Sequence, residues 1–131
     1  MAEIEVYYSP GTEGKVLNRP DGLTVYGVVN SVQDKIVAIV AEYLSSDDPC
    51  GQLNPEDIGF RHDHADGFDR SVYDLEINIT VEPAPIRCAN LRLRTQEIKN
   101  QLGELLPKGL RFSVEVCPYE SYRMIGTGCA S

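Results

Sequence analysis

The chain has 131 residues, of which 42% are hydrophobic, and it carries a formal net charge of -8 at pH 7. This length fits a single domain, residues 1–131, with one hydrophobic core. No apolar run is long enough to cross a membrane. The excess of carboxylates disfavours general binding of nucleic acid, because such binding requires Lys and Arg to neutralise phosphates.

The first residues, 1–5, lack the basic region and the apolar stretch of a signal peptide. We therefore expect a cytoplasmic protein with no membrane partner. The cysteines show neither the C-x-x-C spacing nor any zinc-binding pattern. In an intracellular chain the expected state is four free thiols, at Cys50, Cys88, Cys117 and Cys129.

Glu3 to Tyr8 alternate between polar and apolar side chains, which predicts a strand with one buried face. A long connection rich in Gly, Pro and Asn follows from Ser9 to Gly27, and residues 23–26 within it are predicted to be extended. A connection of this length is either functional or mobile. Its glycines form neither G-x-G-x-x-G nor a P-loop, so we expect no phosphate-binding loop and no cofactor.

The next segment shows helical periodicity. Ser31 and Asp34 resemble a capping box, and the apolar residues that follow fall on one stripe, which predicts a helix from about Asn30 to Leu44. The stripe consists of Val32, Ile36, Ile39, Val40, Tyr43 and Leu44. Residues 54–57 then form a predicted turn that leads into a short strand at 58–62.

The second half repeats this order. Tyr73 to Glu82 alternate for ten residues and predict a strand, which Pro83 and Pro85 end. A second helix follows, and a last strand runs from Leu110 to Cys117. In the tail, Tyr122, Met124 and Ile125 alternate, which suggests a short edge strand or a contact with a partner. The second helix has its apolar stripe at Leu91, Ile98, Leu102, Leu105 and Leu106.

Two successive β-α-β units predict an α+β domain, in which a four-stranded sheet carries two helices on one face. The opposite face is then polar and meets solvent or a hydrated interface. Two folds have this order of elements: the tautomerase fold and the ferredoxin-like split β-α-β fold. Periodicity does not reveal which strands are neighbours, so both remain open. The residues expected on the polar face are Glu3, Glu5, Tyr7, Glu76, Asn78, Thr80, Glu82, Arg111, Ser113 and Glu115.

Most of the chain outside Ser9 to Gly27 resembles the 5-carboxymethyl-2-hydroxymuconate isomerases of the tautomerase superfamily. The similar features are the alternating strand into Thr80, a turn with an arginine, a helix that closes on residues 104–106, and the strand at 110–116. Residues 54–61 resemble the family's passage from helix to second strand. The resemblance implies a homotrimer and an isomerase of small oxo or enol carboxylates.

The resemblance also implies site residues. The base in this family is an N-terminal proline that becomes exposed when the initiator methionine is removed, whereas this chain has Ala2. Removal of Met1 would expose a primary α-amine, which titrates near pH 8 and could act as a base. Arg61 and Arg87 stand at positions that resemble the arginines binding the substrate carboxylate, since a guanidinium holds both oxygens. The competing interpretation for each is an ordinary surface arginine.

His62-Asp63-His64 supports a different hypothesis. In a strand, residues 62 and 64 point to the same face, so both imidazoles could bind one metal, with Asp66 or Asp69 as a third ligand. The segment enters a turn and the chain has no third histidine, so we expect no metal. The alternative function, from another class, is a non-catalytic ferredoxin-like module for binding or assembly.

Overall fold

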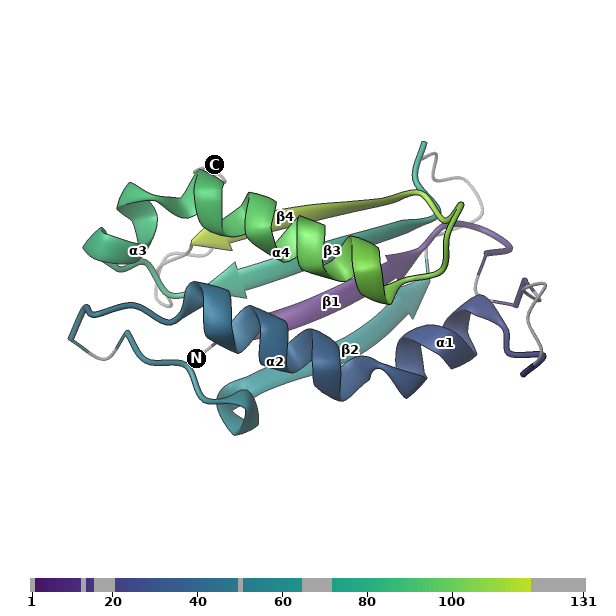
Figure 1. Cartoon of the computed structure of the whole chain (residues 1–131), viewed down its shortest axis with the longest axis horizontal. Helices are drawn as coiled ribbons and strands as arrows, with labels where there is room; N and C mark the ends of the chain where they lie inside the picture. Colours follow the sequence, from purple (N-terminus) through teal and green to yellow (C-terminus); the bar gives the residue numbers. More distant parts are fainter. Residues whose placement is uncertain (1, 13, 16–20, 50, 65–71, 119–131) are drawn as a thin grey trace.

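The computed structural model describes residues 2–12, 14–15, 21–49, 51–64 and 72–118 (Figure 1). It shows the predicted α+β architecture, in which helices cover one face of a four-stranded mixed sheet. The strands are β1 (Ala2–Tyr8), β2 (Ile58–His64), β3 (Leu75–Val81) and β4 (Phe112–Pro118). The helices are α1 (Val25–Ser31), α2 (Gln33–Leu44), the short 3-10 helix η1 (Pro55–Asp57), α3 (Pro85–Ala89) and α4 (Leu91–Leu105).

The strand order is β2-β1-β3-β4. β1 runs parallel to β2 and antiparallel to β3, and β3 runs parallel to β4. The two strands of each β-α-β unit are therefore direct neighbours, and the units meet at the antiparallel pair in the middle of the sheet. A split β-α-β unit has another strand between its two strands. The ferredoxin-like alternative does not fit this order.

The core fills the layer between the sheet and helices α2 and α4, which lie side by side over it (Figure 1). Because side chains alternate along a strand, the inward residues of β1 fall in this layer, and Ile4, Val6 and Tyr8 are completely buried. The same holds for Ile77 and Ile79 of β3. The helices contribute the stripe expected from their periodicity, at Ile36, Val40, Leu44, Leu91, Ile98 and Leu102.

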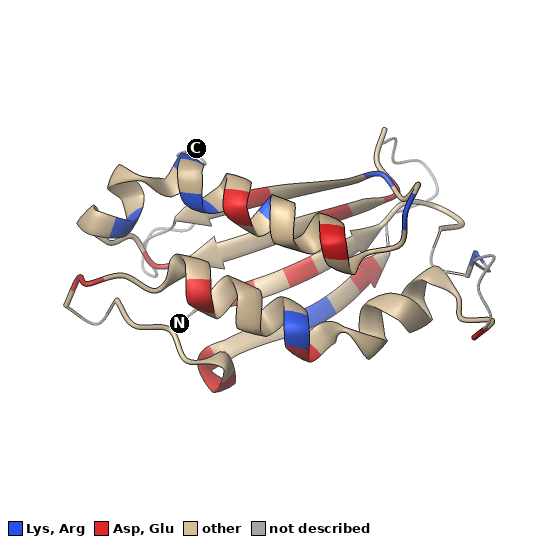
Figure 2. Ribbon diagram, viewed as in Figure 1, with Lys and Arg blue, Asp and Glu red and all other residues tan. Residues whose placement is uncertain are grey.

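The helices of the described residues leave the other face of the sheet uncovered, and acidic residues recur along the strands (Figure 2). The register places these side chains in rows across the sheet: Glu5 lies beside Arg61 on β2 and beside Asn78 on β3. The outward positions are polar, as the alternation predicts, and they also include Asp63, Ser113, Glu115 and Cys117.

Helix α1 differs from the prediction of an extended segment at 23–26. It begins at Val25 because the Thr24 hydroxyl accepts a hydrogen bond from the Gly27 N–H at 3.1 Å and so caps the helix. The predicted capping box is also wrong. The Ser31 hydroxyl donates to the carbonyl of Val28 at 2.7 Å, in the last turn of α1. Helix α2 then begins at Gln33 with no side-chain cap.

Two further boundaries differ. Strand β2 continues to His64, and residues 85–89 form helix α3 where a turn was predicted. Pro85 opens α3 because its fixed φ angle suits a first helical turn. The turn that the segment His62-Asp63-His64 was predicted to enter and the predicted edge strand at residues 122–125 lie outside the described residues.

Among the described cysteines, Cys88 is free and Cys117 is disulfide-bonded. The prediction of four free thiols is therefore wrong for Cys117. Cys50 and Cys129 lie outside the described residues.

No helix in the described part of the chain is both long enough and apolar enough to cross a membrane.

Candidate functional site

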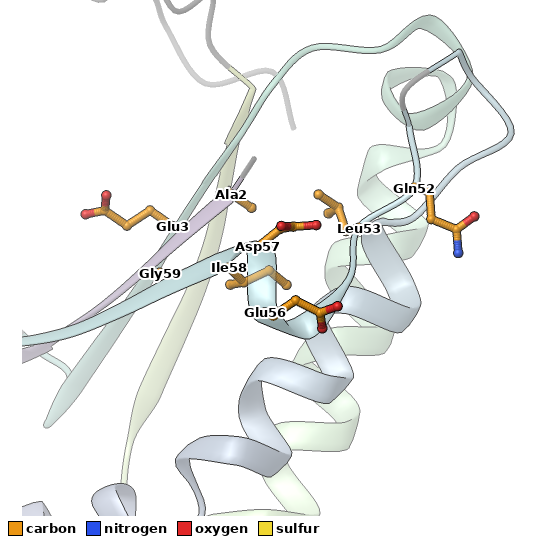
Figure 3. Close-up of a pocket in the computed structure, with 8 residues that line it drawn as sticks. All are labelled: Ala2, Glu3, Gln52, Leu53, Glu56, Asp57, Ile58 and Gly59. Atoms are coloured by element: carbon orange, nitrogen blue, oxygen red, sulfur yellow. The ribbon is translucent and has the colours of Figure 1, made fainter.

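A cavity of about 520 Å³ lies where β1 and β2 begin side by side (Figure 3). The two strands are parallel and in register, with Ala2 opposite Ile58, so their first residues reach the same edge of the sheet. Helix η1 and the loop before it complete the wall. A cavity of this size holds a small organic molecule. Its lining residues are Ala2, Glu3, Gln52, Leu53, Glu56, Asp57, Ile58 and Gly59.

The wall of the cavity combines apolar and acidic side chains. Ala2, Leu53 and Ile58 are buried and also belong to the hydrophobic core. Glu56 and Asp57 are exposed, and both come from η1, where Pro55 fixes the first residue of the turn. Figure 3 shows Asp57 between the start of β1 and the loop that carries Leu53, with Glu56 beyond Ile58. Any ligand would therefore contact apolar surface and face carboxylates.

The loop wall is fastened to the end of α2. The Ser45 hydroxyl accepts from the N–H of Leu53 at 2.8 Å and donates to its carbonyl at 3.1 Å. The carbonyl of Gly51 accepts from the N–H of Ser46 at 3.0 Å. A Cβ atom at Gly51 would lie 2.9 Å from the Ser46 carbonyl oxygen, closer than side chains tolerate. The tight turn therefore requires glycine at this position.

Arg87 also binds this loop, through the carbonyl of Gly51. Its side chain is only 2% exposed, and its guanidinium donates to three backbone carbonyls. Nε bonds Leu44 at 2.6 Å, Nη2 bonds Gly51 at 2.9 Å, and Nη1 bonds Glu82. Leu44 ends α2 and Glu82 follows β3, so one side chain joins three segments. Desolvation by burial lowers the pKa of Arg87, although Asp48 favours its charged form.

Asp48 complements this arginine. Its carboxylate accepts from the N–H groups of Ile86 at 2.9 Å and Arg87 at 3.1 Å, in the first turn of α3, and from the Ser46 hydroxyl at 2.6 Å. Burial raises the pKa of Asp48, but the hydrogen bonds from Ser46, Ile86 and Arg87, together with the charge of Arg87, outweigh it and lower that pKa. An anion in this position also caps the helix.

Arg61 lies on the outward face of β2. Its Nε donates to Glu5 at 2.9 Å and lies 3.4 Å from Glu3 and 3.5 Å from Asp63. The hydrogen bond to Glu5 is the main reason that the pKa of Arg61 is raised.

The structure therefore brings one of the three predicted site residues to the cavity. Ala2 lines it, whereas the guanidinium of Arg61 contacts carboxylates on the outward face and that of Arg87 is occupied by carbonyls. Arg87 has a structural role, because its guanidinium is buried, donates to three backbone carbonyls and does not line the cavity.

The two histidines of β2 differ in their surroundings. His62 packs among the rings of Tyr8, Tyr26 and Phe60, with centroid distances of 4.7–5.8 Å. Its Nδ1 lies 2.8 Å from the Tyr8 hydroxyl and its Nε2 lies 3.3 Å from Gln33 Oε1. Because Gln33 Oε1 only accepts, Nε2 carries the hydrogen and Nδ1 accepts from Tyr8. Burial lowers the pKa of His62.

The metal hypothesis for His62 and His64 gains no support from this arrangement, because both ring nitrogens of His62 already have polar partners. Within the described residues no three His, Cys, Asp or Glu side chains gather as a metal site. Asp66 and Asp69, the expected third ligands, lie outside the described residues.

Sequence reasoning did not single out Leu53, Glu56 and Asp57 as site residues. The available signal was positional. Residues 54–57 form a turn that leads directly into β2, and the first strand begins at the N-terminus. If these two strands are parallel neighbours, their starts meet at one edge, together with the turn. Which strands are neighbours depends on contacts across the sheet, and periodicity alone does not predict it.

Comparison with known proteins adds no family to this description. No model of a known protein family matches the chain, and no curated protein matches it.

Proposed function

We propose that the chain is a proton-transfer isomerase of the tautomerase type, with the α-amine of Ala2 as its base. The observation that carries the proposal is the position of Ala2, which opens β1 and lines the cavity between β1, β2 and η1. Removal of Met1 would place the free amine at the cavity. The order β2-β1-β3-β4, with two parallel β-α-β pairs, supports the tautomerase fold that the resemblance implies.

The proposed reaction needs a base that titrates near neutral pH and a surface that holds the substrate. An amine with a pKa near 8 is partly unprotonated at neutral pH and can accept a proton. In the proposed reaction it takes the proton of an enol hydroxyl and delivers a proton to the neighbouring carbon, so that the enol becomes a ketone with no net change of charge or oxidation state. The apolar surface of Leu53 and Ile58 would hold the body of the substrate. Arg61 and Arg87 have no part in this proposal.

The test compares the chain with its Ala2→Pro variant. The assay follows the loss of enol absorbance for phenylenolpyruvate and for its methyl ester, and mass spectrometry of the protein shows whether Met1 has been removed. A proline is tolerated at the first residue of a strand and supplies a secondary amine, so we expect a rate higher by roughly tenfold or more. Acetylation of the α-amine should abolish that rate. A folded Ala2→Pro variant at the buffer rate for both enols would refute the proposal.

The second candidate is a non-catalytic module for binding or assembly. It is favoured by the open polar face of the sheet, which the described helices leave uncovered (Figure 2). This candidate predicts no turnover of any enol by the chain or by Ala2→Pro, with the fold intact.

A further inference from the structure

The resemblance implies a carboxylate substrate, and the charges around the cavity do not favour one. Among its lining residues are Glu3, Glu56 and Asp57 but no Lys or Arg. Glu3 is turned to the other side of β1 from Ala2 (Figure 3), where it lies 3.4 Å from Arg61. Two carboxylates, those of Glu56 and Asp57, thus remain on the side of the cavity that η1 forms.

These two carboxylates have no neutralising partner in the described part of the chain. Asp57 accepts a long hydrogen bond of 3.4 Å from the Asn54 amide, which carries no charge. The described ion pairs all belong to Arg61. A protonated α-amine at Ala2 would offset one of the two carboxylates, so a substrate anion in the cavity would still meet net negative charge, and the net charge of -8 of the whole chain adds to that repulsion.

The two arginines predicted to bind a substrate carboxylate, Arg61 and Arg87, bind other groups of the chain. Arg61 would have to leave Glu5, Glu3 and Asp63 to reach a ligand. Arg87 would have to leave three backbone carbonyls, of which that of Gly51 would keep the N–H of Ser46 as a donor while those of Leu44 and Glu82 would lose the guanidinium.

We infer that the cavity selects a small uncharged or cationic substrate with an apolar body, and that Glu56 and Asp57 exclude carboxylates. This inference rests on the proposed function, since it specifies the substrate class of the same site. Leu53, Ile58 and Ala2 supply the apolar contact, and the two carboxylates supply the selection by charge.

The experiment separates charge selection from turnover. Three ligands that share a phenyl ring, phenylacetate, methyl phenylacetate and phenethylammonium, are titrated at pH 7.5 into the isotope-labelled full chain, and binding is read from the amide signals of Gln52, Leu53 and Gly59. Each of the two carboxylates attracts the cation and repels the anion, and the interaction is appreciable even in water at a separation of about 4 Å, so we expect the Kd of the anion to exceed that of the cation roughly tenfold or more. The uncharged ester should fall between them.

Two variants of equal net charge complete the design. Glu56→Gln/Asp57→Asn should reduce the ratio of anion to cation Kd to near one. Glu97→Gln/Glu104→Gln removes the same charge from exposed positions on α4 and should leave the ratio unchanged. Tighter binding of phenylacetate than of phenethylammonium, equal effects of the two variants, or no response of the cavity amides to any ligand would overturn the inference. If the ligands bind in the expected order and no enol is converted, the proposed function fails while the charge selection stands.

Discussion

At the scale of single residues, His62 is the side chain whose surroundings have the clearest thermodynamic consequence. Burial lowers its pKa in the folded chain, so the unfolded chain binds a proton more readily than the folded one. Folding stability should therefore rise with pH. The contribution of His62 to stability is fully present above the pKa of about 6.5 in the unfolded chain. It is progressively lost as the pH falls below that value towards the lowered pKa of the folded chain.

Replacing His62 by Gln should remove this contribution to the pH dependence. We expect urea unfolding between pH 7 and pH 5 to show a shallower dependence of the free energy of unfolding on pH for His62→Gln. The effect for one proton is at most about tenfold per pH unit in the unfolding constant. The control is His64→Gln, an exposed position on the same strand. If His62→Gln kept the full slope, the ring would not be the group that titrates.

The sequence predicts burial correctly at positions where alternation or helical spacing alone decides which side chains face the core. Ile4, Val6 and Tyr8 are buried as predicted, because a strand with one covered face permits only that arrangement. The prediction failed at Arg87. An arginine in an acidic chain was expected at the surface or on a substrate, but the partners that bury it are backbone carbonyls from three segments distant in sequence, and no local pattern encodes them.

At the scale of elements, the end of α2 depends on arginines from the second half of the chain. Arg94 of α4 donates to the carbonyls of Tyr43 at 2.9 Å and Ser45 at 2.7 Å, and Arg87 donates to that of Leu44. Carbonyls at a helix C-terminus lack partners within the helix, and a cation also interacts favourably with the helix dipole there. These contacts join the two β-α-β units on the helix side of the sheet.

The substitution Arg87→Met tests this junction. It preserves much of the apolar stem but removes the guanidinium donor from the carbonyls of Leu44, Gly51 and Glu82 and leaves Asp48 without its counter-charge. We expect the free energy of unfolding to fall by about 3 kcal/mol, as measured by urea denaturation. Arg92→Met, at an exposed position on α4, is the matched control and should change stability little.

The same substitution has a local signature, because the loop that Arg87 holds also lines the cavity. Hydrogen exchange at the amides of Gly51 and Leu53 should accelerate in Arg87→Met and not in Arg92→Met. An Arg87→Met variant with unchanged stability and unchanged exchange would show that the carbonyls find other donors, and the role given to Arg87 would be wrong.

At the scale of the whole molecule, the order of elements could be predicted but their neighbours could not. Two β-α-β units with one stripe per helix follow from periodicity, and both are present. Whether the two strands of a unit pair directly or enclose another strand depends on contacts between residues far apart in sequence. The direct pairing of β1 with β2 also places Ala2 next to Ile58. The cavity therefore depends on the strand order, which periodicity does not predict.

The open sheet face leads to the prediction about assembly. The resemblance implies a homotrimer, and the uncovered face is the surface that such an assembly would bring together. The described outward positions of the strands carry one positive charge, that of Arg61, and five negative charges. The carboxylates are those of Glu3, Glu5, Asp63, Glu76 and Glu115. Bringing such faces together places like charges near one another, and salt screens this repulsion.

We therefore expect light scattering at micromolar concentration to give about three times the chain mass at 0.15 M salt, and a smaller mass near 0.01 M salt, where the screening length is about fourfold longer. Glu76→Gln removes a carboxylate from the face and should preserve the trimer to lower salt. Glu97→Gln, which removes a charge from the exposed surface of α4, should not. A monomer at every salt concentration would rule out trimer formation, and equal effects of the two variants would mean that the assembly uses another surface.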